Sequence, residues 1–145
     1  IHENDRHLLE EGKFNWPRGA CRWGKFLRRM LIPFVKNSKL PPLNADIILS
    51  DNDYPLNEYG IPGKIIYTPG HTAGSVSVLL DSGEAFAGCL AHNNIPFRLK
   101  PNLPIFAEDL EQLKLSWKKI IKMGAQTIYP GHGDLFPLDK ISDKI

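Results

Sequence analysis

Cysteine is scarce in this chain of 145 residues, which contains Cys21 and Cys89 and no other. Two cysteines are too few for the disulfide framework of a small secreted domain, although one bridge and two reduced thiols are both compatible with the count. Long apolar runs are also absent, because none approaches the roughly 18 residues that are needed to cross a bilayer. We therefore expect no transmembrane segment, and the lack of a disulfide pattern favours the cytoplasm.

Acidic residues are missing from residues 13–45, a segment that contains eight basic residues. The rest of the chain is acidic overall, so this segment alone accounts for the net charge of +2. Such a balance does not indicate a nucleic-acid-binding protein, and we expect no nucleic-acid partner.

Within the basic segment, residues 22–32 carry apolar side chains at helical spacing, which predicts an amphipathic helix. Pro33 should end or kink this helix, because it lacks an amide proton and clashes with the preceding turn. Two interpretations of the helix are open. We favour a helix that covers a sheet and leaves a basic face in solvent; the alternative is a helix that binds a membrane surface or an anionic partner.

A single layered domain is the organisation that the remaining patterns predict. Apolar residues make up 42% of the chain and charged residues 23%, values typical of a globular protein rather than a disordered one. Helical periodicity and end signals predict helices at 3–11, 22–32, 108–123 and 138–143. Short apolar or alternating runs predict strands at 47–50, 64–67, 75–80, 84–87 and 126–129. This order of elements is typical of an α/β or layered α+β fold.

Three short motifs carry residues with metal-binding chemistry. They are Thr-Pro-Gly-His-Thr-Ala-Gly-Ser at 68–75, Phe-Ala-Gly-Cys-Leu at 86–90 and Tyr-Pro-Gly-His-Gly at 129–133. Each places an imidazole or a thiol beside a glycine where a strand is expected to end, so His71, Cys89 and His132 can meet at one edge of a sheet. Two imidazoles and a thiolate suit zinc. Solvated histidines and a small buried cysteine are the alternative interpretation.

Taken together, these motifs resemble the C-terminal half of the metallo-β-lactamase superfamily domain. A β-hairpin follows the first motif and a helix precedes the third, as in that family, and the resemblance extends from about residue 1 to residue 138. It implies half of a four-layer αβ/βα sandwich, a mixed sheet on which the helices at 22–32 and 108–123 pack. Residues 1–145 are then expected to be a single partial domain.

The resemblance also implies a metal centre. His71 resembles the third histidine of the family's first zinc site, and His132 resembles the histidine of the second site. Cys89 stands where most members have a bridging aspartate, as in the zinc enzymes that hold their second ion through a thiolate. His92 lies where those enzymes place a cationic substrate contact, so we take it as the candidate substrate-binding residue. A substitute ligand and simple exposure are its alternative roles, and exposure is the commonest state of a single loop histidine.

The family's His-x-His-x-Asp-His motif is absent from this chain. We therefore interpret the chain as a fragment of a zinc-dependent hydrolase, in which metal-bound hydroxide attacks an ester, thioester, amide or phosphoester. No catalytic residue is assigned, the fragment alone is expected to be inactive, and its zinc to be weakly bound or absent. The small-molecule substrate is expected to be selected by loops at 13–21, 33–45 and 91–105, with candidates Trp16, Phe34, Phe97, Arg98 and Lys100.

Half of a sandwich should expose a sheet face that the other half covers. An apolar patch of that kind predicts a partner, either the missing N-terminal half or a second copy of the chain in a dimer. The competing interpretation of the whole sequence is a non-catalytic, truncated homologue that acts as an interaction protein.

Overall fold

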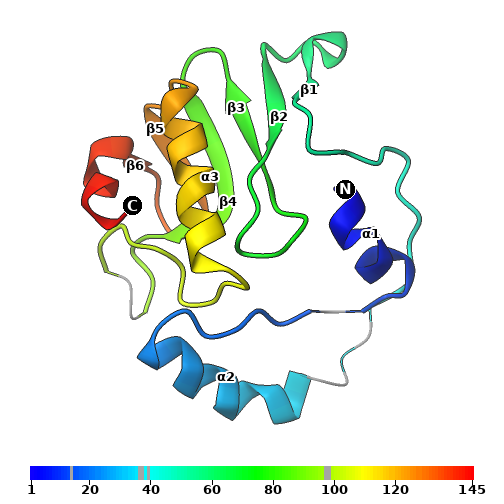
Figure 1. Cartoon of the computed structure of the whole chain (residues 1–145), viewed down its shortest axis with the longest axis vertical. Helices are drawn as coiled ribbons and strands as arrows, with labels where there is room; N and C mark the ends of the chain where they lie inside the picture. Colours follow the sequence, from blue (N-terminus) through cyan, green and yellow to red (C-terminus); the bar gives the residue numbers. More distant parts are fainter. Residues whose placement is uncertain (14, 36–37, 39, 97–98) are drawn as a thin grey trace.

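Six strands form one mixed sheet, and the computed structural model describes them within residues 1–13, 15–35, 38, 40–96 and 99–145 (Figure 1). The strands are β1 (Tyr54–Pro55), β2 (Gly63–Tyr67), β3 (Val76–Leu80), β4 (Glu84–His92), β5 (Thr127–His132) and β6 (Phe136–Pro137). They lie side by side in chain order, antiparallel throughout except for the parallel pair β4 and β5. The expected α/β class with a mixed sheet is confirmed.

Helix α3 (Leu110–Lys122) packs on one face of this sheet and supplies much of the core. Its residues Leu113, Trp117 and Ile120 are fully buried, and burial of each contributes about 1.5–3 kcal/mol to folding. The carboxylate of Asp109 accepts a hydrogen bond from the backbone N–H of Gln112 (2.9 Å) and caps the helix. The helix predicted at 108–123 is therefore present, starting two residues later.

The connection through α3 makes β4 and β5 parallel, so both strands end at the same edge of the sheet. β4 continues to His92 and β5 to His132, beyond the ends predicted at residues 87 and 129. The sequence signal stopped short because Gly88 and Pro130 interrupt the apolar runs, whereas backbone pairing continues past them with shifts in register. The longer strands carry the candidate metal ligands on regular structure rather than in loops.

The strand predicted at 47–50 is wrong. Leu49 makes a single parallel bridge to His2, and Ile47 and Ile48 are exposed. The edge strand of the sheet is instead β1, at Tyr54–Pro55. The bridge at Leu49 leads into helix α1 (Glu3–Glu10), which matches the helix predicted at 3–11 and ends before Gly12 in the left-handed region, φ 60°.

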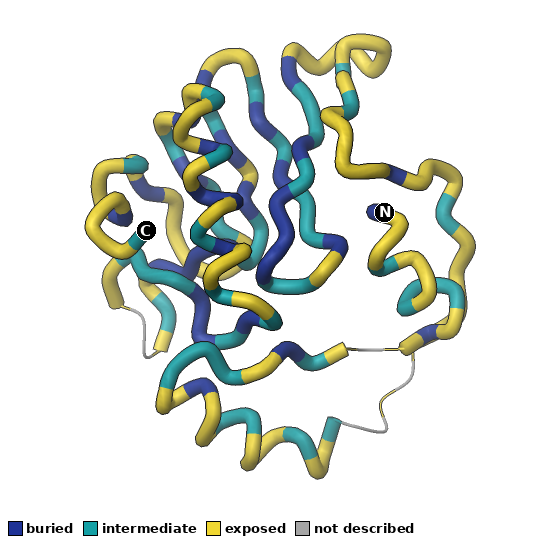
Figure 2. Tube along the Cα trace, viewed as in Figure 1, coloured by how far each residue is buried: buried dark blue, intermediate teal, exposed yellow. Residues whose placement is uncertain are grey.

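Helix α2 (Arg22–Val35) forms where a helix was predicted, but it does not cover the sheet. It lies across the end of the molecule, and Figure 2 shows most of its length as exposed or half-buried, with Gly24 its buried residue. Pro33 also fails to end it at Ile32. The proline stands in the last turn, where it removes a single amide donor, and the helix stops two residues later.

The sheet face opposite α3 carries Ile65, Val78, Phe86 and Tyr129 in one register row across four strands. Phe86 is 45% exposed and stacks on Tyr129 with ring centroids 4.7 Å apart. Ile65, Val78 and Tyr129 are half-buried, so Phe86 is the exposed member of this row, and the expectation that a partner covers the face stays a prediction.

The chain after β5 differs in detail from the prediction. β6 was not expected, and the helix predicted at 138–143 is two short 3-10 helices, at Leu138–Lys140 and Ser142–Lys144. Within the described ranges, no helix has the length and apolar character required to span a membrane.

Candidate metal centre

Three donor side chains meet where β4 and β5 end. The ligand atoms of Cys89, His92 and His132 all lie within 4.8 Å of one another. The Sγ atom of Cys89 is 3.5 Å from Nδ1 of His132, and the rings of His92 and His132 meet edge to face with centroids 5.0 Å apart. The structure thus brings together two of the three predicted ligands and adds His92.

His92 departs from the commonest expectation for a loop histidine, since it is a strand residue and only 5% exposed. It pairs in register with His132 in the parallel β4–β5 ladder, and its backbone also exchanges hydrogen bonds with Asn102. The interpretation of His92 as an exposed residue is therefore wrong. The sequence hid this because four further residues of β4, the last of them His92, follow Gly88, where the strand signal ended.

His71 lies outside the three-residue cluster but faces the same cavity. Its Nδ1 is 3.0 Å from the carbonyl oxygen of Phe106. A carbonyl can only accept, so Nδ1 carries the hydrogen and Nε2 keeps its lone pair, which is the arrangement common among metal-binding histidines. Burial lowers the pKa of His71, while the hydrogen bond to Phe106 opposes that shift. The imidazole is therefore neutral, the form that binds metals, at neutral pH.

The thiol of Cys89 is half-buried, and this burial raises its pKa. Without a nearby cation the side chain is therefore a neutral thiol at neutral pH. A divalent ion at this position would reverse that preference, because a coordinated thiol loses its proton.

Close backbone packing holds the segments beside His71 and His132, the two predicted histidines. A side chain at Gly133, φ 92°, would place its Cβ 1.3 Å from the carbonyl oxygen of Asn93. At Gly70, φ 134°, a Cβ would lie 2.5 Å from the backbone of Leu113 on α3. Glycine is thus required beside His71 and His132 for both conformation and space.

Two adjacent residues of α3 fix the backbone just after β2 and near the end of β4. The hydroxyl of Ser116 donates to the carbonyl of Pro69 (2.7 Å), and the indole N–H of Trp117 donates to the carbonyl of Leu90 (3.1 Å). Both contacts are buried. They hold the backbone within two residues of His71 and within one residue of Cys89.

Asp5 of α1 holds the far side of the His71 loop, a role that was not predicted from the sequence. Its carboxylate accepts hydrogen bonds from the hydroxyl of Thr72 (2.6 Å) and from the backbone N–H of Gly74 (3.0 Å). Asn4 adds a hydrogen bond from its side-chain amide to the hydroxyl of Tyr67 (3.0 Å). No local pattern could have revealed these contacts, because they join residues more than 60 positions apart.

A mostly apolar cavity of about 420 Å³ opens over the donor cluster. It is lined by His71, Cys89, His92 and His132 and by Trp16, Pro17, Leu27, Leu31, Ile95, Ile105 and Phe106. Two of the three loops expected to select substrate, 13–21 and 91–105, contribute to it. Phe34, the candidate from the loop at 33–45, lies on α2 and is not among the lining residues. In the loop at 91–105, Lys100 is not among them either, and Phe97 and Arg98 lie outside the described residues.

A comparison with known families decides the relationship. The model of the metallo-β-lactamase superfamily matches residues 6–132. The chain belongs to the metallo-β-lactamase superfamily. The resemblance that the three motifs suggested is therefore confirmed.

Curated relatives of the chain include two proteins named beta-lactamase-like protein 2 homolog. The one from Caenorhabditis elegans is 35% identical over 97 residues, which is 66% of this chain and 29% of that protein. The one from Drosophila melanogaster is 33% identical over 81 residues, 54% of this chain and 25% of that protein. The chain thus matches less than a third of the length of either relative.

Solved structures show the same fold at low sequence identity. The BLEG-1 B3 metallo-beta-lactamase aligns with a TM-score of 0.66 and 18% identity, covering 97% of this chain and 59% of that one. A metallo-beta-lactamase family protein from Thermus thermophilus aligns with a TM-score of 0.56 and 16% identity, covering 97% of this chain and 48% of that one. These similarities establish the fold.

Proposed function

We propose that the chain is part of a zinc-dependent hydrolase of the metallo-β-lactamase superfamily. The observation that supports this most directly is the cluster of Cys89, His92 and His132, whose donor atoms lie within 4.8 Å of one another. Sulfur and imidazole nitrogen form a donor set that zinc prefers, and His71, with Nε2 available, lines the same cavity. The donor chemistry of this edge therefore fits the metal of the family.

In this proposal, Cys89 and His132 hold zinc, and His71 belongs to the neighbouring metal position. His92 has two candidate roles, a contact to substrate and a third zinc donor, and the cluster geometry favours the donor role. Zinc bound at this edge supplies a Lewis acid that activates water at neutral pH. The residues of the chain orient the ligands through Phe106, Ser116 and Trp117, as described above.

The proposed reaction is hydrolysis of an ester, thioester, amide or phosphoester in a small molecule. A cavity of about 420 Å³ is within the range of small-molecule sites. Its apolar lining by Trp16, Leu27, Leu31 and Ile105 favours a substrate with an apolar group beside the bond that is cleaved. The scarcity of cysteine, with Cys21 and Cys89 both unbridged, supports a cytoplasmic location.

The proposal includes a partner for the sheet face opposite α3. In an αβ/βα sandwich a second sheet covers the row of Ile65, Val78, Phe86 and Tyr129. An N-terminal half-domain is the first candidate and a second copy of the chain is the other. We accordingly treat residues 1–145 as a single partial domain that has no hydrolase activity alone, because His71 is its one candidate ligand for the first metal position. Turnover of a generic ester by residues 1–145 alone, abolished by His132→Ala, would contradict this.

Zinc content of the full-length protein, the form expected to be active, is the measurement that tests the proposed site. We expect Cys89→Ala and His132→Ala to weaken zinc binding by at least about a hundredfold, since even losing a hydrogen bond to a metal ligand costs about 10–100-fold. Cys21→Ala and His7→Ala are matched controls outside the cluster and should bind as the unaltered protein does. The variant His92→Gln separates the two roles of His92. If His92 is a zinc donor, the variant binds zinc more weakly; if His92 contacts substrate, only KM changes.

The alternative is a non-catalytic homologue that acts as an interaction protein. A thiol in place of the family's usual bridging carboxylate is the observation that favours it. The hydrolase proposal is wrong if the purified full-length protein contains no zinc and if Cys89→Ala leaves its activity unchanged. This alternative then stands.

A further inference from the structure

Helix α2 presents an apolar face away from the rest of the molecule. Phe26 is 53% exposed, Met30 57% and Phe34 82%, and Trp23, which meets Phe26 edge to face, is about half exposed. At 3.6 residues per turn these four positions lie within about 80° of one another around the helix. We call them the apolar arc.

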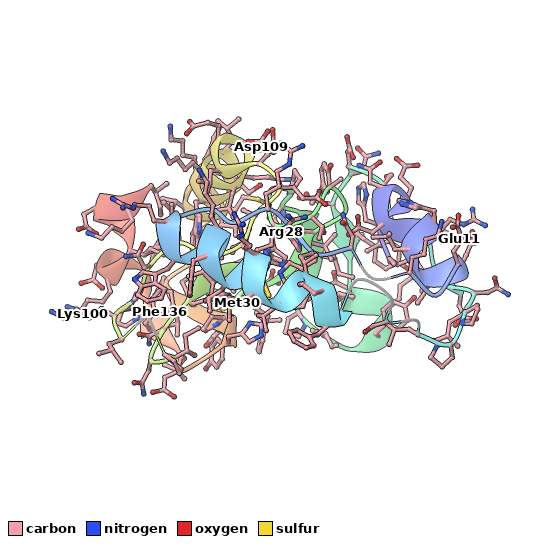
Figure 3. The ribbon with its side chains drawn as sticks, turned by 90° about the horizontal axis from the view of Figure 1, so that it is seen from below. Glu11, Arg28, Met30, Lys100, Asp109 and Phe136 are labelled. Atoms are coloured by element: carbon pink, nitrogen blue, oxygen red, sulfur yellow. The ribbon has the colours of Figure 1, made fainter. Side chains whose placement is uncertain are left out.

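A basic rim borders one edge of the apolar arc. Arg22, Lys25 and Arg29 are exposed on α2, and they project next to Phe26 when the helix is viewed down its axis. No acidic residue occurs from residue 13 to residue 45 to neutralise this rim. Figure 3, in which α2 is the element nearest the viewer, shows that the helix lies at the surface along its length.

The rotation of α2 is fixed by the side of the helix that adjoins the apolar arc beyond Phe34, where Leu27, Leu31 and Gly24 follow one another. A Cβ on Gly24 would lie 2.0 Å from the carbonyl oxygen of Ile105, so the helix backbone touches that segment directly. Leu27 and Leu31 face the cavity over the donor cluster. The helix therefore cannot roll to bury the apolar arc without breaking these contacts.

From this placement we infer that α2 docks on a membrane surface that carries anionic lipids. An amphipathic helix that lies in a bilayer interface places tryptophan, phenylalanine and other apolar residues among the acyl chains and basic residues at the headgroups. The apolar arc and the basic rim have that arrangement. The charge complements anionic headgroups, and the attachment is peripheral, resting on one helix face rather than on a membrane span.

A second copy of the chain is a poorer occupant for the same surface. An antiparallel two-fold contact between two copies of the apolar arc would bring one basic rim against the other, which electrostatics opposes. The row of Ile65, Val78, Phe86 and Tyr129 on the sheet face, in contrast, is itself uncharged. The two exposed apolar surfaces therefore suit different partners.

Vesicle flotation of the full-length protein tests the inference. We expect binding to vesicles of equal parts phosphatidylcholine and phosphatidylglycerol, and binding about tenfold or more weaker to phosphatidylcholine alone. The double variants Phe26→Ser/Met30→Ser and Lys25→Glu/Arg29→Glu should each lose about tenfold or more of the binding to the anionic vesicles. Binding should also shift the fluorescence of Trp23 to the blue, and Trp23→Phe should lose that change.

Matched variants on α3 provide the controls, because Leu115, Ile121, Lys118 and Lys122 are exposed there. Leu115→Ser/Ile121→Ser and Lys118→Glu/Lys122→Glu alter hydrophobicity and charge equally and should bind as the unaltered protein does. The inference is overturned if the full-length protein does not float with anionic vesicles, or if both sets of variants lose binding equally. It is also overturned if Phe26→Ser/Met30→Ser instead dissociates an oligomer in sedimentation.

Discussion

Helices α2 and α3 are both amphipathic in sequence, yet they end in opposite environments. The apolar residues Leu113, Trp117 and Ile120 of α3 are completely buried against the sheet, whereas Phe26 and Phe34 of α2 are exposed. Figure 2 shows the contrast along the two helices. Periodicity specifies which side chains share a face, but the surface that covers this face is set by contacts far away in the sequence. An apolar stripe is therefore evidence for a helix and not for its burial.

The largest expected difference between the helices is in their contribution to stability. Trp117→Ala should reduce the free energy of unfolding by about 3–5 kcal/mol, because it leaves a cavity in the core and removes the donor to the carbonyl of Leu90. Phe26→Ala, at an exposed position, should change it by no more than about 0.5 kcal/mol. Urea unfolding of the two variants measures both values. Similar losses would show that α2 is as tightly packed as α3 in solution.

A glycine substitution in α2 probes how that helix is attached. In an isolated helix Gly→Ala stabilises by about 1 kcal/mol. At Gly24 we expect the opposite sign, a loss of about 1–3 kcal/mol, because the new Cβ would overlap the carbonyl oxygen of Ile105 at 2.0 Å. Hydrogen exchange should show the amides of α2 losing protection while those of α3 keep theirs. A stabilised Gly24→Ala variant would mean that α2 does not touch this segment in solution.

Helix α1 differs from both α2 and α3, because it is joined to β2 and to the His71 loop through polar contacts. The Tyr67 hydroxyl accepts from Asn4 and donates to the carbonyl of Ala73 (2.8 Å), and burial raises the pKa of Tyr67. The folded protein therefore keeps this proton to higher pH than the unfolded chain does, so stability is present below about pH 10 and declines above it.

The Tyr67→Phe variant should show a smaller alkaline decline of its melting temperature than the unaltered protein. Tyr54→Phe is the comparison, since the pKa of the half-buried Tyr54 is also raised, but mainly by a hydrogen bond to Tyr59. An unchanged alkaline profile in Tyr67→Phe would exclude Tyr67 as the source.

Local sequence predicted the elements of this fold well where a turn, a helix cap or a glycine motif marked their ends clearly. The hairpin of β3 and β4, helix α3 and the three motifs were all recognised from turn residues, caps and glycines. The pattern at 47–50 misled because a short apolar run does not distinguish a strand from a segment that makes one bridge. The meeting of Cys89 and His132 followed from strand order, but the burial of His92 depended on pairing across β4 and β5 that glycines concealed. Asp5 could not be foreseen, because it holds a loop 67 residues away.

The parallel pairing of β4 with β5 also determines when the donor cluster forms during folding. β2, β3 and β4 pair as successive neighbours, whereas Cys89 and His132 meet only after a loop of 43 residues containing α3 has closed. Such non-local pairings form slowly, so the donor cluster assembles late. An ion that binds only this completed cluster contributes nothing to the preceding barrier. It therefore lengthens the lifetime of the folded chain without accelerating its formation.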